Sequence, residues 1–173
     1  MTDLINSNVK EILKLGIQKQ KEKNFHQAKK YYENAIQIDP EIVFAHYNLG
    51  LINEKLGNIE EAKKNYVQVI KVKPKFIYSY NNLGILFQKE GKKEKAIEYF
   101  KKVIKLDYKN LSAYNNMGLV YASLGRYNES LNCYFNTLKI EENNIIAIKS
   151  IIFLMTYYIP KNNHPLINAN NRL

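Results

Sequence analysis

The stretch Tyr-Asn-Asn-Leu-Gly at residues 80–84 decides the fold, because it recurs along the chain. Tyr-Asn-Asn-Met-Gly follows at 114–118, and His-Tyr-Asn-Leu-Gly precedes it at 46–50, each 34 residues away. A fixed period of this length is typical of proteins that stack copies of one small unit. We therefore expect a repeat protein.

Glycine gives the clearest view of the repeat. Position 1 of a 34-residue frame falls at Val9, Val43, Ile77 and Leu111. All seven glycines then occupy two positions: position 8 (Gly16, Gly50, Gly84, Gly118) and position 15 (Gly57, Gly91, Gly125, with Lys23 in the first unit). A glycine inside a helix costs about 1 kcal/mol relative to alanine, so position 8 indicates close helix packing. Position 15 suits the left-handed residue that ends a helix.

Other positions of the frame carry one residue type each. Position 20 is small (Ala28, Ala62, Ala96, Ser130), position 24 is aromatic (Tyr32, Tyr66, Phe100, Tyr134), and position 32 is proline in the first two units (Pro40, Pro74). Apolar residues recur at three- and four-residue steps, which is helical spacing. Proline after the second run of apolar residues predicts the end of a helix. Each unit is therefore predicted to be two antiparallel helices joined by a tight turn.

The fold prediction follows from stacking these units. One helix pair cannot bury its own apolar face, whereas stacked pairs can. We expect an all-α solenoid of four units, 9–42, 43–76, 77–110 and 111–144, then an apolar capping helix at 145–159 and a flexible tail at 160–173. The predicted helices are 9–22, 25–38, 43–56, 59–72, 77–90, 93–106, 111–124, 127–140 and about 145–158.

These motifs resemble the tetratricopeptide repeat (TPR) family over residues 9–144. The shared features are Leu-Gly at positions 7 and 8, alanine at 20, an aromatic at 24 and proline at 32. The resemblance implies a right-handed superhelix whose concave groove is lined by the first helix of each unit. We therefore predict a scaffold that binds a partner protein or an extended peptide.

Asparagine at position 6 is the candidate contact with such a peptide. It occurs as Asn48, Asn82 and Asn116. A carboxamide offers one acceptor and two donors, which matches the hydrogen-bonding groups of a peptide bond. Neighbouring groove positions add Phe44 and Tyr78 (position 2) and Leu51, Ile85 and Leu119 (position 9). The alternative is that these asparagines are structural and cap helices or bridge repeats.

The asparagine column also resembles the repeat arm of O-linked N-acetylglucosamine transferases and their SPINDLY relatives. The stretch 147–167 resembles the junction between that arm and the catalytic part, through Ala147, Ser150, Phe153, Leu154, Tyr157 and Pro160. The resemblance implies, as an alternative function, a substrate-recognition arm of a protein O-GlcNAc or O-fucose transferase. Every glycine belongs to the repeat, so no phosphate-binding loop is left, and this chain is not expected to be an enzyme.

Other sites are not predicted. His26, His46 and His164 lack metal-ligand spacing, and His46 is expected to be a packing residue. We expect neither a metal nor a cofactor. The Lys and Asn pattern by which some TPR proteins clamp acidic chaperone tails is matched only at Asn48, so no such clamp is predicted.

Charge and cysteine content limit which partners and which cellular compartment are expected. The formal net charge is +10, but lysine supplies nearly all of it, with arginine only at 126 and 172. Arginine dominates base and phosphate recognition, so nucleic-acid binding through lysine is a lesser alternative. The single Cys133 excludes an internal disulfide, and the start of the chain has no apolar signal segment. A cytoplasmic or nuclear location is expected.

The capping helix is unusual because it is apolar nearly all round. In residues 144–159 only Lys149, Ser150 and Thr156 interrupt the apolar run that follows Asn144. One face must cover the fourth unit, which leaves an exposed apolar patch on the other. A downstream domain, self-association or a partner protein would each explain such a patch.

Overall fold

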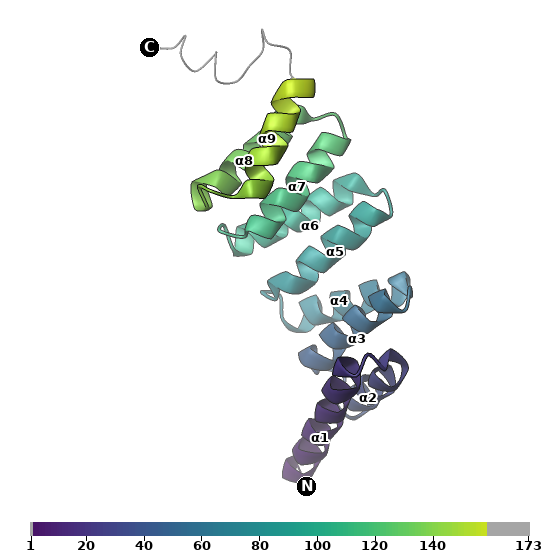
Figure 1. Ribbon diagram of the computed structural model, residues 1–173. Coiled ribbons are helices and arrows are strands. Elements are labelled where there is room, and N and C mark those ends of the chain that lie inside the picture. Colours follow the sequence, from purple (N-terminus) through teal and green to yellow (C-terminus); the bar gives the residue numbers. More distant parts are fainter. Residues whose placement is uncertain (1, 159–173) are drawn as a thin grey trace. The chain divides into compact units, whose positions relative to one another are not determined.

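The computed structural model describes residues 2–158, with side chains from Ser7 onward. Within these residues it holds nine helices and no strand: α1 (Thr2–Lys21), α2 (Phe25–Ile38), α3 (Val43–Lys55), α4 (Ile59–Val72), α5 (Ile77–Lys89), α6 (Lys93–Leu106), α7 (Leu111–Ser123), α8 (Tyr127–Ile140) and α9 (Ile145–Tyr157) (Figure 1). The all-α prediction is confirmed. From α2 onward each helix begins where predicted and ends within one residue of the expected position.

The start of the first helix is the exception. It was predicted near residue 9, whereas α1 begins at Thr2. The frame marks where the repeat starts, but residues 2–8 contain neither proline nor glycine that would stop a helix from extending toward the N-terminus. The frame was therefore a good guide to the unit and a poor one to this helix end.

The chain divides into two compact units that are larger than the 34-residue repeats, and from here on the first unit is Met1–Leu86 and the second unit is Phe87–Leu173. In the first unit, consecutive helices pack in series from α1 to α4. In the second unit, α6 packs on α7, α7 on α8, and α9 on both α7 and α8. Each unit is thus a stack of antiparallel helices, as expected of a solenoid (Figure 1).

Glycine at position 8 makes room for an aromatic ring. A methyl group added to Gly50 would lie 2.5 Å from the ring of Tyr66, and one added to Gly118 would lie 2.8 Å from that of Tyr134. Gly16 has the same relation to Tyr32. The close approach predicted between the paired helices is present, but it is the ring at position 24 that fills the space above the glycine.

The turn between paired helices has the predicted left-handed residue. Gly57, Gly91 and Gly125 have φ angles of 79°, 74° and 73°. Lys23 occupies the same place in the first repeat with φ 58° and is the only non-glycine residue with positive φ among those described. A side chain in this region is disfavoured by about 1–2 kcal/mol, so Lys23 is a strained position.

The second helices end without requiring proline. α2 and α4 stop two residues before Pro40 and Pro74, but α6 stops at the equivalent place before Tyr108. The carboxylate of Asp107 accepts a hydrogen bond from the backbone N–H of Lys109 at 3.1 Å, which closes the turn locally. Asn110 and Asn144 then cap α7 and α9 by accepting from Ala113 and Ala147, both at 3.0 Å.

Several predictions lie outside the described residues. They are the last residue of the 145–159 helix, the flexible tail at 160–173, and the roles of Pro160 and His164.

Candidate functional site

The three predicted asparagines occupy equivalent places on α3, α5 and α7. Each side chain is half-buried, and the residues that follow it at positions 7 and 8 are buried. The amide of Asn48 donates to the backbone oxygen of Phe44 at 2.8 Å. The amide of Asn116 lies 3.5 Å from the hydroxyl of Ser112, a long contact. Neither residue caps a helix or bridges two repeats through these bonds.

Asn82 differs from the other two because its donor atom is unsatisfied. Its Nδ2 is buried and makes no hydrogen bond of good geometry. The amide nevertheless lies close to the phenols of Tyr47 and Tyr66. Burial raises the pKa of both phenols, and the Asn82 amide opposes part of that rise. A buried donor without a well-placed partner costs about 1–3 kcal/mol, so the hydrogen bonding of Asn82 differs from that of the other two asparagines.

The amide of Asn82 adjoins a group of aromatic rings that we call the Tyr47 cluster: Tyr47, Tyr66, Phe76 and Tyr78. The ring of Tyr47 lies 5.9 Å from Tyr66, 5.0 Å from Phe76 and 6.4 Å from Tyr78. Tyr66 is fully buried, whereas Tyr78 is 60% exposed. The cluster therefore runs from the core to the surface beside an unpaired amide, and a ligand can reach its outer ring.

The sequence identified only part of this cluster. Tyr78 was predicted from position 2, but Tyr47 stands at position 5, one residue later than the tyrosines at position 4 of the next two repeats. Phe76 precedes α5 and belongs to no recognised groove position. The usable signal was the density of aromatic residues in 76–80.

The remaining predicted groove residues divide between the two units. Leu51 and Ile85 are half-buried, and Phe44 is 44% exposed with its ring 6.2 Å from that of Tyr32. Asn116 and Leu119 belong to the second unit. The alignment of all three asparagines on one wall therefore stays a prediction.

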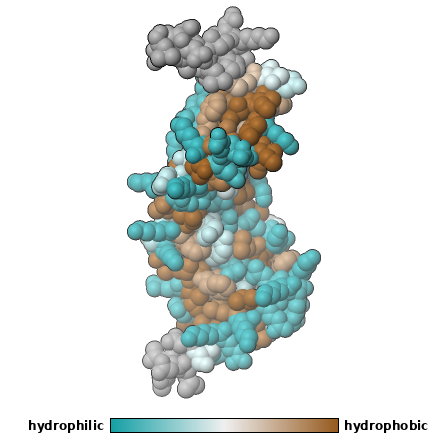
Figure 2. Space-filling view, turned by 60° about the vertical axis from the view of Figure 1, so that its left-hand side comes forward, coloured by the Kyte–Doolittle hydropathy of each residue, from teal (hydrophilic) through white to brown (hydrophobic). Residues whose placement is uncertain are grey.

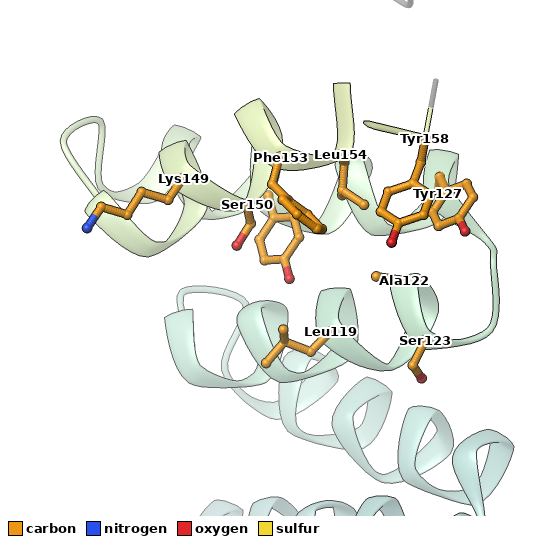
Figure 3. A pocket seen from close by; sticks show the side chains of 10 residues that line it. Leu119, Ala122, Ser123, Tyr127, Lys149, Ser150, Phe153, Leu154 and Tyr158 are labelled. Atoms are coloured by element: carbon orange, nitrogen blue, oxygen red, sulfur yellow. The ribbon is translucent and has the colours of Figure 1, made fainter. Parts of the chain in front are cut away.

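The second unit contains a pocket of about 400 Å³ between α7, α8 and α9 (Figure 3). Leu119, predicted at position 9, is 49% exposed and lines it. The other lining residues are Ala122, Ser123, Tyr127, Tyr134, Lys149, Ser150, Phe153, Leu154 and Tyr158. Ligand pockets typically measure about 300–1,000 Å³ and are mostly apolar, so the size and lining suit a ligand.

Aromatic rings form one side of this pocket. Tyr127 and Tyr158 stack with centroids 4.6 Å apart, and Phe153 meets Tyr158 edge-on at 5.6 Å. Tyr134, which is 1% exposed, supplies a phenol whose pKa is raised by burial and lowered in part by the hydroxyls of Ser150 and Ser130. Hydroxyls are therefore available within an otherwise apolar cavity.

Several other polar residues are explained by structure alone. His46 is buried, with its two ring nitrogens 3.1 Å from the Asn65 side chain and 2.9 Å from the Pro40 backbone oxygen, so it is the predicted packing residue. Ser130, which stands where the other three repeats have alanine, donates to the Gly118 oxygen at 2.7 Å. Asn115 accepts from Thr137 at 3.1 Å. Each of these three side chains is thus accounted for by a hydrogen bond within the fold.

The helix α9 exposes the apolar patch predicted for it. Ile145, Ile152 and Tyr157 are 66%, 59% and 71% exposed, and Phe153 is 51% exposed. Figure 2 shows apolar side chains gathered at the C-terminal end of the described chain. No described segment of the chain covers them.

Two further properties concern the described residues as a whole. No helix among them is long and apolar enough to cross a membrane. No group of three or more His, Cys, Asp or Glu side chains in that part of the chain is placed to hold a metal ion.

Family profiles of the tetratricopeptide repeat match residues 15–42, 43–76, 77–107 and 112–144. The chain belongs to the TPR family. The matched segments follow the helix pairs closely, and they end before α9, so α9 is not part of a recognised TPR unit. A search among curated proteins found no match.

Solved structures with the same fold include bacterial TPR proteins. One crystal structure of MamA has a TM-score of 0.80 at 23% identity, covering 87% of this chain and 82% of its own. PilF of Pseudomonas aeruginosa has a TM-score of 0.74 at 18% identity, covering 88% and 69%. MamA of Desulfovibrio magneticus has a TM-score of 0.72 at 17% identity, covering 79% and 77%. These likenesses concern the fold.

TPR proteins generally bind protein partners, and the repeats support the same role, a protein-interaction scaffold, for this chain. The TPR fold resembles that of non-catalytic interaction proteins. The matching profiles describe the repeat itself, so the resemblance to the arm of O-GlcNAc transferases stays a prediction.

Proposed function

We propose that this TPR protein binds an extended segment of a partner protein along its first helices, with Asn48, Asn82 and Asn116 contacting the backbone. The observation that carries the proposal is the unpaired, buried amide of Asn82 beside the partly exposed Tyr47 cluster. A carboxamide at this place can exchange hydrogen bonds with a peptide backbone.

The asparagines alone cannot provide tight binding. Three net hydrogen bonds of about 1 kcal/mol each correspond to millimolar affinity or weaker. Apolar contacts must supply the rest, and burial of one large side chain adds about 1.5–3 kcal/mol. The side chains available for these apolar contacts are Tyr78 and Leu119. Both are exposed, and they lie about one helical turn from Asn82 and Asn116.

The test compares two triple variants in a pulldown from cell extract. Asn48→Ala/Asn82→Ala/Asn116→Ala is expected to lose most partners captured by the wild type while keeping its helical content. The matched control changes three exposed asparagines on second helices, Asn34, Asn128 and Asn132, to alanine. If the groove variant keeps every partner, the asparagines are structural and the proposal fails.

A second candidate function is the substrate-recognition arm of a protein O-glycosyltransferase. It is favoured by the asparagine column together with the junction-like residues Ala147, Ser150, Phe153, Leu154 and Tyr157. Three of them, Ser150, Phe153 and Leu154, line the pocket of the second unit. Reading the gene beyond codon 173 tests this candidate, since it requires a catalytic domain in the same frame.

Binding of nucleic acid through lysine has less support. Several lysines are already paired with glutamates on their own helices, as in Lys63–Glu60 at 2.6 Å and Lys64–Glu61 at 2.7 Å. Binding to phosphates would weaken steeply as the salt concentration rises, so a salt titration against a DNA or RNA probe tests it.

The state of Cys133 is compatible with the proposed cytoplasmic or nuclear location. The thiol is free and buried, and burial raises its pKa to about 12. It is therefore protonated and unreactive at neutral pH. Cell fractionation with a tagged chain tests the location.

A further inference from the structure

The pocket of the second unit lies on the same face of α7 as the candidate asparagine. Asn116, Leu119 and Ser123 follow one another at helical spacing and therefore share a face. Leu119 and Ser123 line the pocket, and Asn116 stands one turn before Leu119. A segment whose backbone meets Asn116 would thus bring its next side chains to the pocket mouth.

The lining of the pocket selects an apolar group. Figure 3 shows Leu119 and Ala122 on α7 facing Ser150, Phe153 and Leu154 on α9, with Tyr127 and Tyr158 closing one end. Leu119 and Phe153 are about half exposed, at 49% and 51%, so the mouth is open. A bulky aliphatic or aromatic side chain fits such a lining better than a polar one.

The charge beside the pocket favours a particular kind of residue next to that apolar side chain in the bound segment. α7 carries no charged residue and α9 carries only Lys149, which is the one charged residue of the lining. Lys149 is exposed, and no ion pair to it is formed within the described side chains. In Figure 3 its ammonium group points away from the cavity. It can therefore meet a neighbour of the bound side chain rather than the side chain itself.

We propose that the pocket takes a bulky apolar side chain of an extended partner segment and that Lys149 pairs with an acidic residue next to it. This proposal rests on the proposed function, and it names the kind of segment that the second unit recognises.

A cationic ligand fits the same pocket poorly, although four aromatic residues line it. Recognition of an ammonium group needs ring faces turned toward the cation. Here Tyr127 and Tyr158 cover each other in a near-parallel stack with an interplanar angle of 25°. Lys149 adds a like charge at the rim. An apolar side chain with an acidic neighbour satisfies both features.

The test is peptide selection on the full-length protein, using a random peptide library displayed on phage. The wild type is expected to enrich peptides with Leu, Ile, Met, Phe or Trp beside Asp or Glu. Lys149→Glu should weaken such peptides about two- to fivefold, the range of an exposed ion pair, and should shift the selected neighbour to Lys or Arg. Lys139→Glu makes the same charge change on α8 outside the pocket and should leave the selection unchanged.

Variants of the cavity test the apolar part. Ala122→Phe fills the pocket and should weaken selected peptides about 10- to 100-fold, the range expected for one buried apolar side chain. Phe153→Ala is the second variant, for use if Ala122→Phe does not fold. It removes one wall of the pocket at a half-exposed position and should also weaken the binding of the selected peptides. Equal binding by these variants, or no shift with Lys149→Glu, overturns the proposal.

Failure here is distinguishable from failure of the proposed function. If selected peptides ignore the pocket variants but lose binding to the asparagine triple variant, the groove binds peptides and only the pocket proposal fails. Occupation by the chain's own residues 159–173 would also overturn it. In that case Leu166→Ser/Ile167→Ser would raise the affinity for pocket-binding peptides in the full-length protein.

Discussion

Replacement of Asn82 by leucine separates a binding role from a structural one. The Nδ2 atom of Asn82 is buried without a partner, and leucine has a similar size but no polar group. Removal of an unsatisfied buried donor should recover about 1–3 kcal/mol. Asn82→Leu is therefore expected to stabilise the free protein and to weaken the binding of its partner.

Asn48→Leu is the matched control. Asn48 occupies the same position of the preceding repeat, but its amide donates to the Phe44 oxygen at 2.8 Å. The change should lose a bond worth about 0.5–1.5 kcal/mol. Both variants exchange asparagine for leucine in a helix, so the difference in helix propensity cancels between them. The two variants should differ by about 2 kcal/mol or more in the free energy of unfolding.

The assay is urea unfolding followed by circular dichroism and by tyrosine fluorescence, since the chain has 14 tyrosines and no tryptophan. With a urea m-value of about 1–3 kcal/mol per M, a difference of about 2 kcal/mol separates the midpoints by about 0.7–2 M. If Asn82→Leu is less stable than both the wild type and Asn48→Leu, the amide is bonded to Tyr47 or Tyr66 in solution. The residue is then structural, and the argument for peptide binding at this position is refuted.

Four other changes test the fold and the exposed helix. Lys23→Gly should stabilise the protein by about 0.5–1 kcal/mol in thermal unfolding, because φ 58° favours glycine. Gly118→Ala should destabilise it by about 1–3 kcal/mol in the same assay, because the added methyl group lies 2.8 Å from the Tyr134 ring. Burial raises the pKa of Tyr32 to about 12, so stability should fall as pH rises from about 10 to 12, and Tyr32→Phe should reduce this fall in pH-dependent urea midpoints. Ile152→Lys should abolish any self-association seen by sedimentation, because Ile152 is 59% exposed on α9.

The fold was predictable because each repeated residue type meets a local requirement of backbone conformation or packing. A left-handed turn needs glycine, and a ring from the second helix needs a glycine beneath it, as at Gly50 and Tyr66. These requirements recur with the unit and are visible as columns of the sequence. Even the strained Lys23 was visible as the departure from its column.

The candidate site was only partly predictable because it depends on contacts between units of the repeat. The column of asparagines places three amides on equivalent helix faces, but it cannot show that Asn82 lacks a partner while Asn48 has one. Tyr47 joins the cluster from position 5, where the next two repeats carry Asn81 and Asn115. The aromatic surface thus depends on Tyr47, which departs from the repeat at position 5. A prediction based on what the repeats share does not identify such a residue.

The helix α9 lines a pocket although it lies beyond the recognised repeats. In the frame of the repeat, Ile152 stands at position 8, where the four repeats have glycine. Because a methyl group on Gly16, Gly50 or Gly118 already lies within 3 Å of a ring, a second helix with an aromatic at position 24 cannot dock on Ile152 at the usual distance. Whatever covers this face must therefore pack differently from a TPR helix. The opposite side of α9 meets no such obstacle, and there Ser150, Phe153 and Leu154 line the pocket with residues of α7 and α8. One substitution at position 8 thus makes α9 unsuitable as the first helix of another ordinary repeat and leaves it suited to closing the last groove.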